Sequence, residues 1–450
     1  MQRSLTKFLI KMLIAKSTSG KDKCFQGDLM YKLAERLFPI CRSITGNGVR
    51  KTLNIIKEYI PELIIREVET GTKEMDWEVP QEWNIKDAYV EDQNGNRVID
   101  FQRSNLHVVG YSVPVNTVMN LEQLQQHLFS IPENPNAIPY VTSYYNSKWG
   151  FCLSHNDRMR LNDGDYKVVI DAEKKNGSLT WAECYFPGSI HKDIFISSYI
   201  CHPSMANNEL SGPVLLVALA NWVKKTKNKY GFHFVLAPET IGPHVVMGEY
   251  LSKLKKNTVA AYNLTCVGDD RAVSYIPSRR GNTINDKAVR HVLKYFFPDY
   301  IEYEFLRDRG SDERQYCSPN VDLPMVSIMR SKYGTYPEYH TSLDNMSVIS
   351  SEGLQKSFDL HCKVIELVQY NKIYESNIIG EPHFAKYGID INLVGSRELS
   401  DFRRHAQNIL MCTDGSLDVI DIAERLDVYY FDLVPVLDWL EDKNLISEID

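Results

Sequence analysis

The segment from Asp193 to Gly212 constrains the fold more than any other part of the sequence. The apolar run Ile194–Ile200 ends two residues before His202, and a polar loop then leads to Ser211-Gly212 and a second apolar run. This order is typical of a strand that delivers a histidine to the carboxyl end of a sheet and is followed by a helix. Because ligands of open α/β sheets bind at that edge, His202 is a candidate site residue.

Strand and helix patterns alternate after this segment. Apolar runs predict strands at 193–200, 232–237, 258–267 and 324–329, and amphipathic runs predict helices at 212–226, 243–255, 285–296 and 351–371. Such alternation predicts α/β architecture, with helices on both faces of a mixed, mostly parallel sheet. Upstream, residues 27–60 have helical periodicity and Ile64–Glu69 fits a strand.

The segment 75–165 has the short alternating runs of a β-rich inserted domain. Asn94-Gly95 predicts a hairpin between Ala88–Asp92 and Arg97–Phe101. A second hairpin, at the edge of the main sheet, is predicted around Asn176-Gly177, between runs that begin at Tyr166 and Ser178. We therefore expect a main domain formed by 1–74 and 166–385, the inserted domain, and a separate C-terminal domain at 399–450.

The C-terminal segment resembles a winged helix, with helical runs at 417–426 and 429–443 followed by a short β-wing. A DNA recognition helix needs Lys and Arg side chains for phosphates and base edges. Residues 429–443 instead carry four acidic side chains and a single basic one, and the whole chain has a net charge of -7. The pattern disfavours nucleic-acid binding and favours a protein partner or a structural role for this acidic domain.

Nine cysteines are scattered through the chain without a Cys-x-x-Cys pair. An odd number without such spacing indicates reduced thiols and a cytoplasmic protein. The basic segment 1–23 has its apolar run cut by Lys11, so we expect an amphipathic helix there rather than a signal peptide. The chain has no apolar run of about 18 residues, so no membrane association is expected.

Three polar motifs interrupt the alternation at the expected strand ends. They contain His202, Glu239 and His340, each a few residues beyond an apolar strand. Imidazole nitrogens bind zinc, and a nearby glutamate can accept a proton from a zinc-bound water. Each residue alone is more simply explained as a surface histidine or as an acid favoured by a helix dipole. Together and in this order, the three residues predict a hydrolytic metal site.

The motifs resemble those of zinc aminopeptidases and glutamate-carboxypeptidase-like exopeptidases. Asn208–Gly212 resembles the family's Asp-Asn-x-Ser-Gly, Glu239–Gly242 resembles Glu-Glu-x-Gly, and Asn263–Gly268 resembles Asn-x-Asp-x-x-Gly. Ser311-Asp312 and Tyr339–Asp344 resemble the later Ser-Asp and Tyr-His-Thr-x-x-Asp elements. The layout is similar to a bacterial aminopeptidase-like group with a β-rich insertion and a C-terminal winged helix. That group is linked to surface-polysaccharide biosynthesis.

The resemblance implies that His202 and His340 are metal ligands and that Glu239 is the catalytic base. The three remaining ligand positions of a two-zinc site hold Asn208, Thr240 and Thr265 instead of carboxylates. Two divalent ions held close together without carboxylates would repel each other strongly. We therefore expect at most one zinc ion. The candidates for its third ligand are Asn208 at the bridging position and the carboxylates Glu209, Asp312 and Asp269.

The resemblance also implies a substrate with an amide bond, either a small peptide or an amino-acylated or amino-sugar compound. Ser311, Asp312 and Tyr339 are candidate substrate-binding residues, and the charged loop 307–314 could contact an anionic substrate. His233 is expected inside a strand, and His244 near the cleft. Two alternatives stay open: a catalytically inactive binding or scaffold protein, and, less favoured, a DNA-binding regulator.

Overall fold

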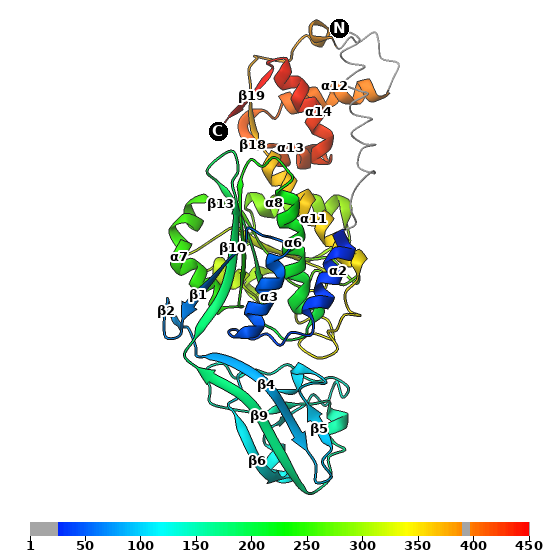
Figure 1. The fold of residues 1–450 in the computed structure, drawn as a ribbon. Coiled ribbons are helices and arrows are strands. Elements are labelled where there is room, and N and C mark those ends of the chain that lie inside the picture. Colours follow the sequence, from blue (N-terminus) through cyan, green and yellow to red (C-terminus); the bar gives the residue numbers. More distant parts are fainter. Residues whose placement is uncertain (1–25, 389–396, 450) are drawn as a thin grey trace. The chain divides into compact units, whose positions relative to one another are not determined.

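The computed structural model describes residues 26–388 and 397–449, and these fold into two compact units (Figure 1). Of these residues, one unit contains 26–286 and 299–362, and the other contains 287–298, 363–388 and 397–449. The helix expected in 1–23 lies outside the described residues. Among the helices that are described, none combines the length and apolarity needed to cross a bilayer.

The first unit is built around an eight-stranded mixed sheet in the order β1-β10-β12-β11-β13-β16-β14-β15. Its four central strands, β12, β11, β13 and β16, run parallel, and β10 and β14 flank them in antiparallel pairing. The strands span Ile64–Glu69 (β1), Ser178–Phe186 (β10), Asp193–Tyr199 (β11), Gly231–Ala237 (β12), Thr258–Asn263 (β13), Ser274–Ile276 (β14), Ile301–Glu302 (β15) and Met325–Met329 (β16). The predicted mixed, mostly parallel sheet is confirmed.

Helices cover both faces of this sheet, with α7 on one face and α2, α3 and α6 on the other (Figure 1). Every residue of β11 and β12 is buried, as expected for strands that are covered twice. The helices of the α/β region are α2 (Gln26–Leu37), α3 (Asn47–Lys57), α6 (Ser211–Val223), α7 (Ile241–Asn257), α8 (Ile284–Phe296), α9 (Phe305–Asp308), α10 (Glu313–Tyr316) and α11 (Ser351–Tyr370). A π-helical turn, η3 (Ala206–Leu210), precedes α6.

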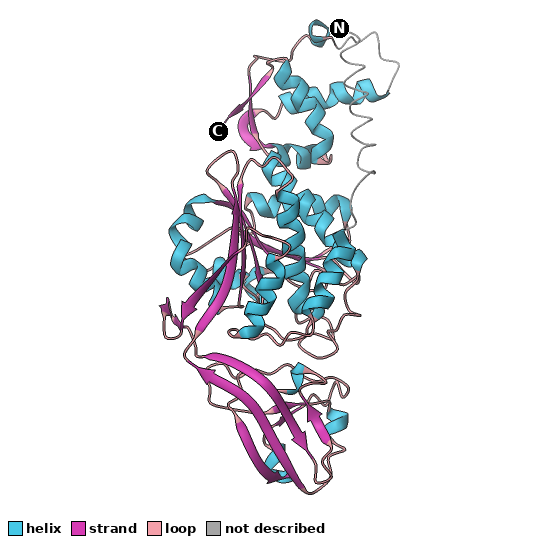
Figure 2. Ribbon diagram, viewed as in Figure 1, coloured by secondary structure: helices cyan, strands magenta, loops and turns pink. Residues whose placement is uncertain are grey.

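The inserted region forms its own four-stranded sheet in the order β5-β4-β9-β6 (Figure 2). Its elements are β2 (Lys73–Glu74), β3 (Trp77–Glu78), β4 (Glu82–Glu91), β5 (Arg97–Asp100), η2 (Asn105–His107), β6 (Val115–Asn120), α4 (Leu121–Gln125), β7 (Leu128–Phe129), β8 (Phe151–Cys152), α5 (His155–Arg158) and β9 (Asp165–Lys175). The antiparallel β4–β5 pair confirms the first predicted hairpin.

The hairpin predicted around Asn176-Gly177 is wrong. β9 pairs with β4 and β6 in the inserted sheet, whereas β10 pairs with β1 and β12 in the main sheet. The chain passes from one sheet to the other at this turn instead of folding back on itself. The inserted region therefore extends to about residue 175 rather than ending at 165.

The second unit contains a three-stranded antiparallel sheet in the order β18-β17-β19. The predicted helix-turn-helix is present, with α13 leading into α14 and then into β19. The C-terminal domain begins earlier than the predicted residue 399, because β17 pairs with both β18 and β19. The elements are β17 (Ile373–Ser376), η4 (Phe384–Tyr387), α12 (Arg397–Leu410), β18 (Asp414–Asp418), α13 (Val419–Leu426), α14 (Tyr430–Asp442) and β19 (Ile446–Ile449).

Candidate active site

Three parallel strands bring the predicted site residues to one edge of the main sheet. β11 leads to His202, β12 leads to Glu239, and the loop after β16 carries His340. The ring centroids of the two histidines lie 5.3 Å apart, and His202 Nε2 lies 3.6 Å from Glu239 Oε2. The structure thus gathers these three side chains in one place, while their chemical roles stay predictions.

A buried hydrogen-bond network fixes the orientation of His202. Its Nδ1 lies 2.9 Å from Glu209 Oε2, and Arg42 Nε donates to Glu209 Oε1 (3.2 Å) and to the His202 carbonyl (2.9 Å). The side chains of Arg42 and Glu209 are 0% exposed, and that of His202 is 4% exposed. Burial disfavours the imidazolium, but the hydrogen bond and charge of Glu209 outweigh it and raise the pKa of His202.

Glu209 lies behind His202 rather than beside its second nitrogen. Both of its carboxylate oxygens are engaged, one with His202 Nδ1 and the other with Arg42. A carboxylate in this place orients the imidazole and leaves Nε2 directed toward Glu239. The structure therefore gives Glu209 a positioning geometry, which differs from the direct metal contact that the sequence suggested.

Glu239 follows β12 at a strained turn. Ser311 Oγ donates to Glu239 Oε1 (3.1 Å), and the Glu239 N–H donates to Cys201 Sγ (3.3 Å). The next residue, Thr240, has a φ of 67°, and its N–H donates to Asp312 Oδ1 (2.8 Å). Burial raises the pKa of Glu239, and burial together with the Glu239 charge raises the pKa of Asp312 well above its usual range. Ser311 and Asp312, predicted to bind substrate, thus support the Glu239 turn.

His340 is held differently from His202. Its backbone has a φ of 54°, and its ring stacks on Tyr339 with centroids 3.9 Å apart. Its Nε2 is buried and has no hydrogen-bond partner among the described residues. Burial and the neighbouring His202 lower the pKa of His340 to about 3, so the ring is neutral. A neutral imidazole with an unpaired nitrogen is suited to bind a metal ion.

The inserted region covers the two histidines with Tyr140. The Tyr140 ring centroid lies 5.1 Å from that of His202 and 5.3 Å from that of His340. The Tyr140 N–H donates to the His340 carbonyl (2.9 Å), and the Tyr140 and Tyr144 hydroxyls lie 2.8 Å apart. Sequence patterns did not identify Tyr140, and the only signal was a proline-rich stretch followed by Tyr144-Tyr145.

Asn208, Thr240 and Thr265 stand at the three positions that lack carboxylates. Asn208 and Thr265 form hydrogen bonds with a neutral hydroxyl, and Thr240 contacts an arginine. Asn208 Nδ2 donates to the Tyr199 hydroxyl (2.8 Å), which lies 2.5 Å from Thr265 Oγ1. Thr240 Oγ1 accepts from Arg314 Nη2 (2.7 Å). These three side chains carry no negative charge, and the guanidinium of Arg314 contacts Thr240. Such surroundings do not suit a second divalent ion.

Two neighbouring carboxylates are already engaged by the protein. Asp269 accepts from Ser331 Oγ (2.8 Å) through Oδ1 and from Asn207 Nδ2 (3.0 Å) through Oδ2, so it is not available as the third ligand. Asp344 accepts the backbone N–H groups of Asn207 (2.7 Å) and Asn208 (2.9 Å). Burial raises the pKa of Asp344 to about 6. These bonds anchor the loop that follows His202.

The donor atoms suit one metal ion. His202 Nε2 faces Glu239, His340 Nε2 lacks a partner, and Asn208 Oδ1 is also buried without one among the described residues. Two imidazole nitrogens are ligands of the kind found in mononuclear zinc sites. The ligand atoms of His202, Glu239 and His340 do not all lie within 4.8 Å of one another; among the described Cys, His, Asp and Glu side chains, only Cys201, His202 and Glu209 form such a group. That group is less suitable, because Arg42 already occupies Glu209 and would repel a cation.

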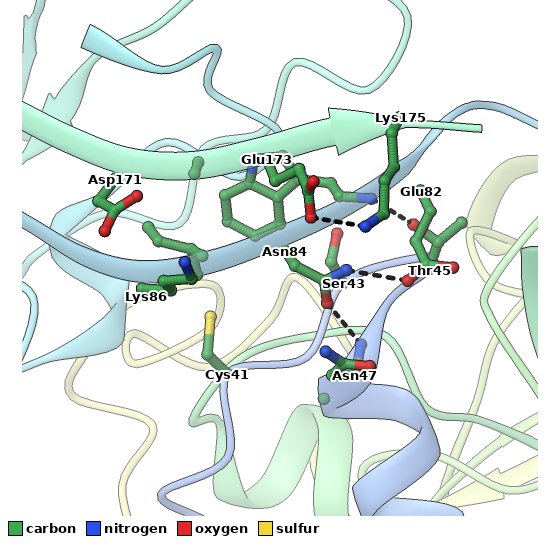
Figure 3. A pocket seen from close by; sticks show the side chains of 14 residues that line it. Cys41, Ser43, Thr45, Asn47, Glu82, Asn84, Lys86, Asp171, Glu173 and Lys175 are labelled. Atoms are coloured by element: carbon green, nitrogen blue, oxygen red, sulfur yellow. Dashed lines mark hydrogen bonds and ion pairs between the residues drawn. The ribbon is translucent and has the colours of Figure 1, made fainter. Parts of the chain in front are cut away.

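A small cavity of about 250 Å³ opens at Glu239 and is lined by Trp77, Tyr144 and Arg314 among other residues. A larger, polar cavity of about 450 Å³ lies against the inserted strands and contains Lys86 and Lys175 (Figure 3). None of the predicted site residues lines the larger cavity. The smaller cavity is therefore the one connected with the candidate chemistry.

The main domain has an aminopeptidase-like fold. A zinc aminopeptidase from Bacillus subtilis is similar over 77% of this chain and 96% of its own, with a TM-score of 0.55 and 11% identity. A peptidase M28 precursor from Shewanella amazonensis is similar over 83% of this chain and 99% of its own, with a TM-score of 0.56 and 11% identity. Likeness at this identity shows the fold.

The chain belongs to the family described as "Domain of unknown function (DUF4910)", whose model matches residues 31–371. A winged helix-turn-helix model matches residues 372–448, in agreement with the C-terminal sheet and helices. A Clostridium acetobutylicum protein is 45% identical over 401 residues, which are 89% of this chain and 91% of that protein. Its provisional name is polysaccharide biosynthesis protein with aminopeptidase-like domain. A crystal structure of a provisionally named peptidase from the same organism is 42% identical, covers 94% of this chain and 96% of its own, and has a TM-score of 0.88.

Proposed function

We propose that this protein is an aminopeptidase-like hydrolase of an amide or peptide bond that uses one zinc ion. The observation that carries the proposal is the convergence of His202, His340 and Glu239, with His202 Nε2 3.6 Å from the Glu239 carboxylate. The unpaired, neutral His340 ring supports a metal ligand rather than a structural histidine. His202, His340 and Asn208 would hold the ion.

Each of the chain's own groups has a distinct task in this proposal. Glu239 accepts the proton of the attacking water and returns it to the leaving amine, and its raised pKa brings it closer to working pH. Ser311 holds the Glu239 carboxylate, and Glu209 with Arg42 holds the His202 ring. When bound, zinc would polarise the amide carbonyl and favour ionisation of the water.

The substrate class remains part of the proposal. The Clostridium acetobutylicum relative carries a name that refers to polysaccharide biosynthesis. An amide on an amino-acylated or N-acylated sugar, or a short peptide, would present the bond that this site can cleave. The eight described cysteines are free thiols, which supports a cytoplasmic location.

The test compares the purified full-length protein with a Glu239→Gln variant. We expect hydrolysis of aminoacyl-p-nitroanilides or of N-acylated amino sugars to fall at least about a hundredfold, because the general base is lost. Zinc content by mass spectrometry and the melting temperature should stay unchanged. Glu249→Gln, at a carboxylate whose side chain is 43% exposed, is the matched control. Full activity in Glu239→Gln would refute the mechanism.

A second candidate function is a catalytically inactive binding protein on the same fold. The neutral residues Asn208, Thr240 and Thr265 favour it, because no charged ligand replaces the three expected carboxylates. The same purification decides between the two functions. Absence of zinc together with absence of hydrolysis would favour the binding protein, whereas one zinc per chain with Glu239-dependent turnover would favour the hydrolase.

A further inference from the structure

The cavity at Glu239 has a composition that specifies what can enter it. Its charged side chains are Glu239 and Arg314, and its walls include Trp77, Tyr144 and Tyr145. The volume of about 250 Å³ is smaller than a typical drug-sized pocket, so it accommodates one small group rather than an extended chain. The aromatic residues come from the inserted region, whereas Arg314 lies on α10.

Arg314 has binding capacity that the protein itself does not use. Among the described residues its guanidinium has one recorded hydrogen bond, from Nη2 to Thr240 Oγ1 (2.7 Å), and no carboxylate lies within ion-pair distance. Arg307 on α9 differs, since its guanidinium pairs with Asp308 (3.2 Å). A guanidinium that is held at one nitrogen can still form a two-point contact with a carboxylate through its other edge.

The aromatic wall is fixed before any ligand enters. Trp77 stacks on His244 with ring centroids 5.6 Å apart and lies 6.1 Å from the Tyr145 ring. The Tyr145 hydroxyl donates to the Glu78 carbonyl (3.0 Å), and Tyr144 bonds the hydroxyl of Tyr140. Aromatic faces of this kind pack against flat or apolar groups. The wall and Arg314 line the same cavity.

We propose that this cavity binds a small, flat group that bears a carboxylate, with Arg314 as the partner of the carboxylate and Trp77 and Tyr145 as the apolar wall. The binding of this group by the cavity does not depend on the proposed function. Only the statement that the group belongs to the substrate cleaved at Glu239 rests on it. It deepens that function by naming an acidic substrate residue next to the scissile amide. Arg314 also places a positive charge near Glu239. This charge offsets the repulsion between the bound carboxylate and the carboxylate of Glu239.

The test measures binding rather than turnover. Isothermal titration calorimetry on the full-length protein compares phenylacetate with phenylacetamide, a neutral ligand of nearly the same shape. We expect phenylacetate to bind about tenfold to a hundredfold more tightly, as for a hydrogen bond between charged partners. Arg314→Gln should remove the difference, and Arg314→Lys should keep part of it because the charge remains without the planar fork. The matched control is Arg307→Gln, since Arg307 is 73% exposed and pairs outside the cavity.

Three outcomes would overturn the proposal. Equal affinity for the two probes would show that no charge is recognised, and a preference that survives Arg314→Gln would place the anion elsewhere. Tighter binding of phenyl phosphate than of phenylacetate by tenfold would replace the carboxylate with a phosphate. Each titration is repeated after chelator treatment, so that binding of the carboxylate to zinc is separated from binding to Arg314. If phenylacetate binds more tightly than phenylacetamide but no amide is hydrolysed, the cavity does bind a carboxylate and the proposed hydrolase activity is refuted.

Discussion

Two buried histidines in this protein belong to networks of the same composition, and only one of them lies at the candidate active site. His202 contacts Glu209, which pairs with Arg42, and His233 contacts Glu183, which pairs with Arg66. His202 lies beyond the end of β11, whereas His233 lies within β12. The two networks contain the same residue types and differ in where the histidine lies along its strand. Comparing them therefore shows what that position changes.

The difference lies in the second ring nitrogen and its surroundings. His202 uses Nδ1 for Glu209, and its Nε2 lies 3.6 Å from Glu239. His233 uses Nε2 for Glu183 (2.7 Å), and its ring is enclosed by Phe195 and Tyr250 at centroid distances of 5.5 and 5.4 Å. A histidine–glutamate–arginine network therefore does not define a site by itself. The candidate site differs in lying beyond a strand end, where Nε2 of His202 has no hydrogen bond to Glu209.

The largest expected difference between the networks concerns stability. Glu209→Ala should lower the free energy of unfolding by about 3–5 kcal/mol, because it leaves a fully buried Arg42 without its counter-charge. Glu183→Ala should cost only about 1–3 kcal/mol, since the Arg66 side chain is 36% exposed and can be hydrated. Urea unfolding of both variants measures the difference. Adding Arg42→Met to Glu209→Ala should restore part of the loss, and equal losses in the two single variants would contradict the comparison.

The second prediction concerns the pH dependence of stability. Burial opposes ionisation of Glu183, but its hydrogen bonds with His233, Tyr250 and Arg66 outweigh this effect and lower its pKa to about 2. The unfolded carboxyl takes up its proton near its ordinary value of 4.5, so this contribution to stability is present above that pH. It is lost progressively as the pH falls from 4.5 toward about 2. Urea midpoints across this range should fall less steeply in Glu183→Gln, and a parallel dependence in both proteins would refute the assignment.

The smallest of the three effects concerns metal affinity. Glu209→Gln should weaken zinc binding by about 10–100-fold, because the carboxylate that orients the proposed His202 ligand becomes a neutral amide. Glu183→Gln should leave the affinity unchanged, because its partner His233 is buried within β12 and is not a proposed zinc ligand. Competition with a fluorescent zinc chelator gives both constants. A similar weakening in the two variants would show that the effect is general destabilisation.

Much of the fold and part of the site follow from local sequence patterns. The strands that end near His202 and Glu239 are apolar runs covered on both faces, and such runs are recognisable without knowledge of their neighbours. Arg42 and Tyr140 could not be predicted in this way. Arg42 is separated by 167 residues from Glu209, and Tyr140 reaches the histidines from the inserted region. Such contacts depend on how distant segments pack together.

The two errors in the predicted architecture have a common cause. The Asn176-Gly177 turn signal is local, but the strands on either side of it pair with β4 and β1 in different sheets. β17 was missed as the start of the C-terminal domain because it has only four residues and its partners β18 and β19 follow much later in the chain. Both errors concern strands that pair with segments distant in the chain. The residues of a turn do not indicate which distant strands will pair.

The register of β1 and β10 has a consequence for the way the inserted region is connected to the main sheet. Glu69 lies directly opposite Ser178 in the antiparallel pair, so the inserted region leaves and re-enters the main sheet at neighbouring positions. A short turn could close the same two strands without disturbing the register of the remaining sheet. The region that supplies Tyr140 and the aromatic wall is thus an expanded hairpin loop. A shortened loop at this point would give a protein with the same sheet and with the two histidines no longer covered by Tyr140.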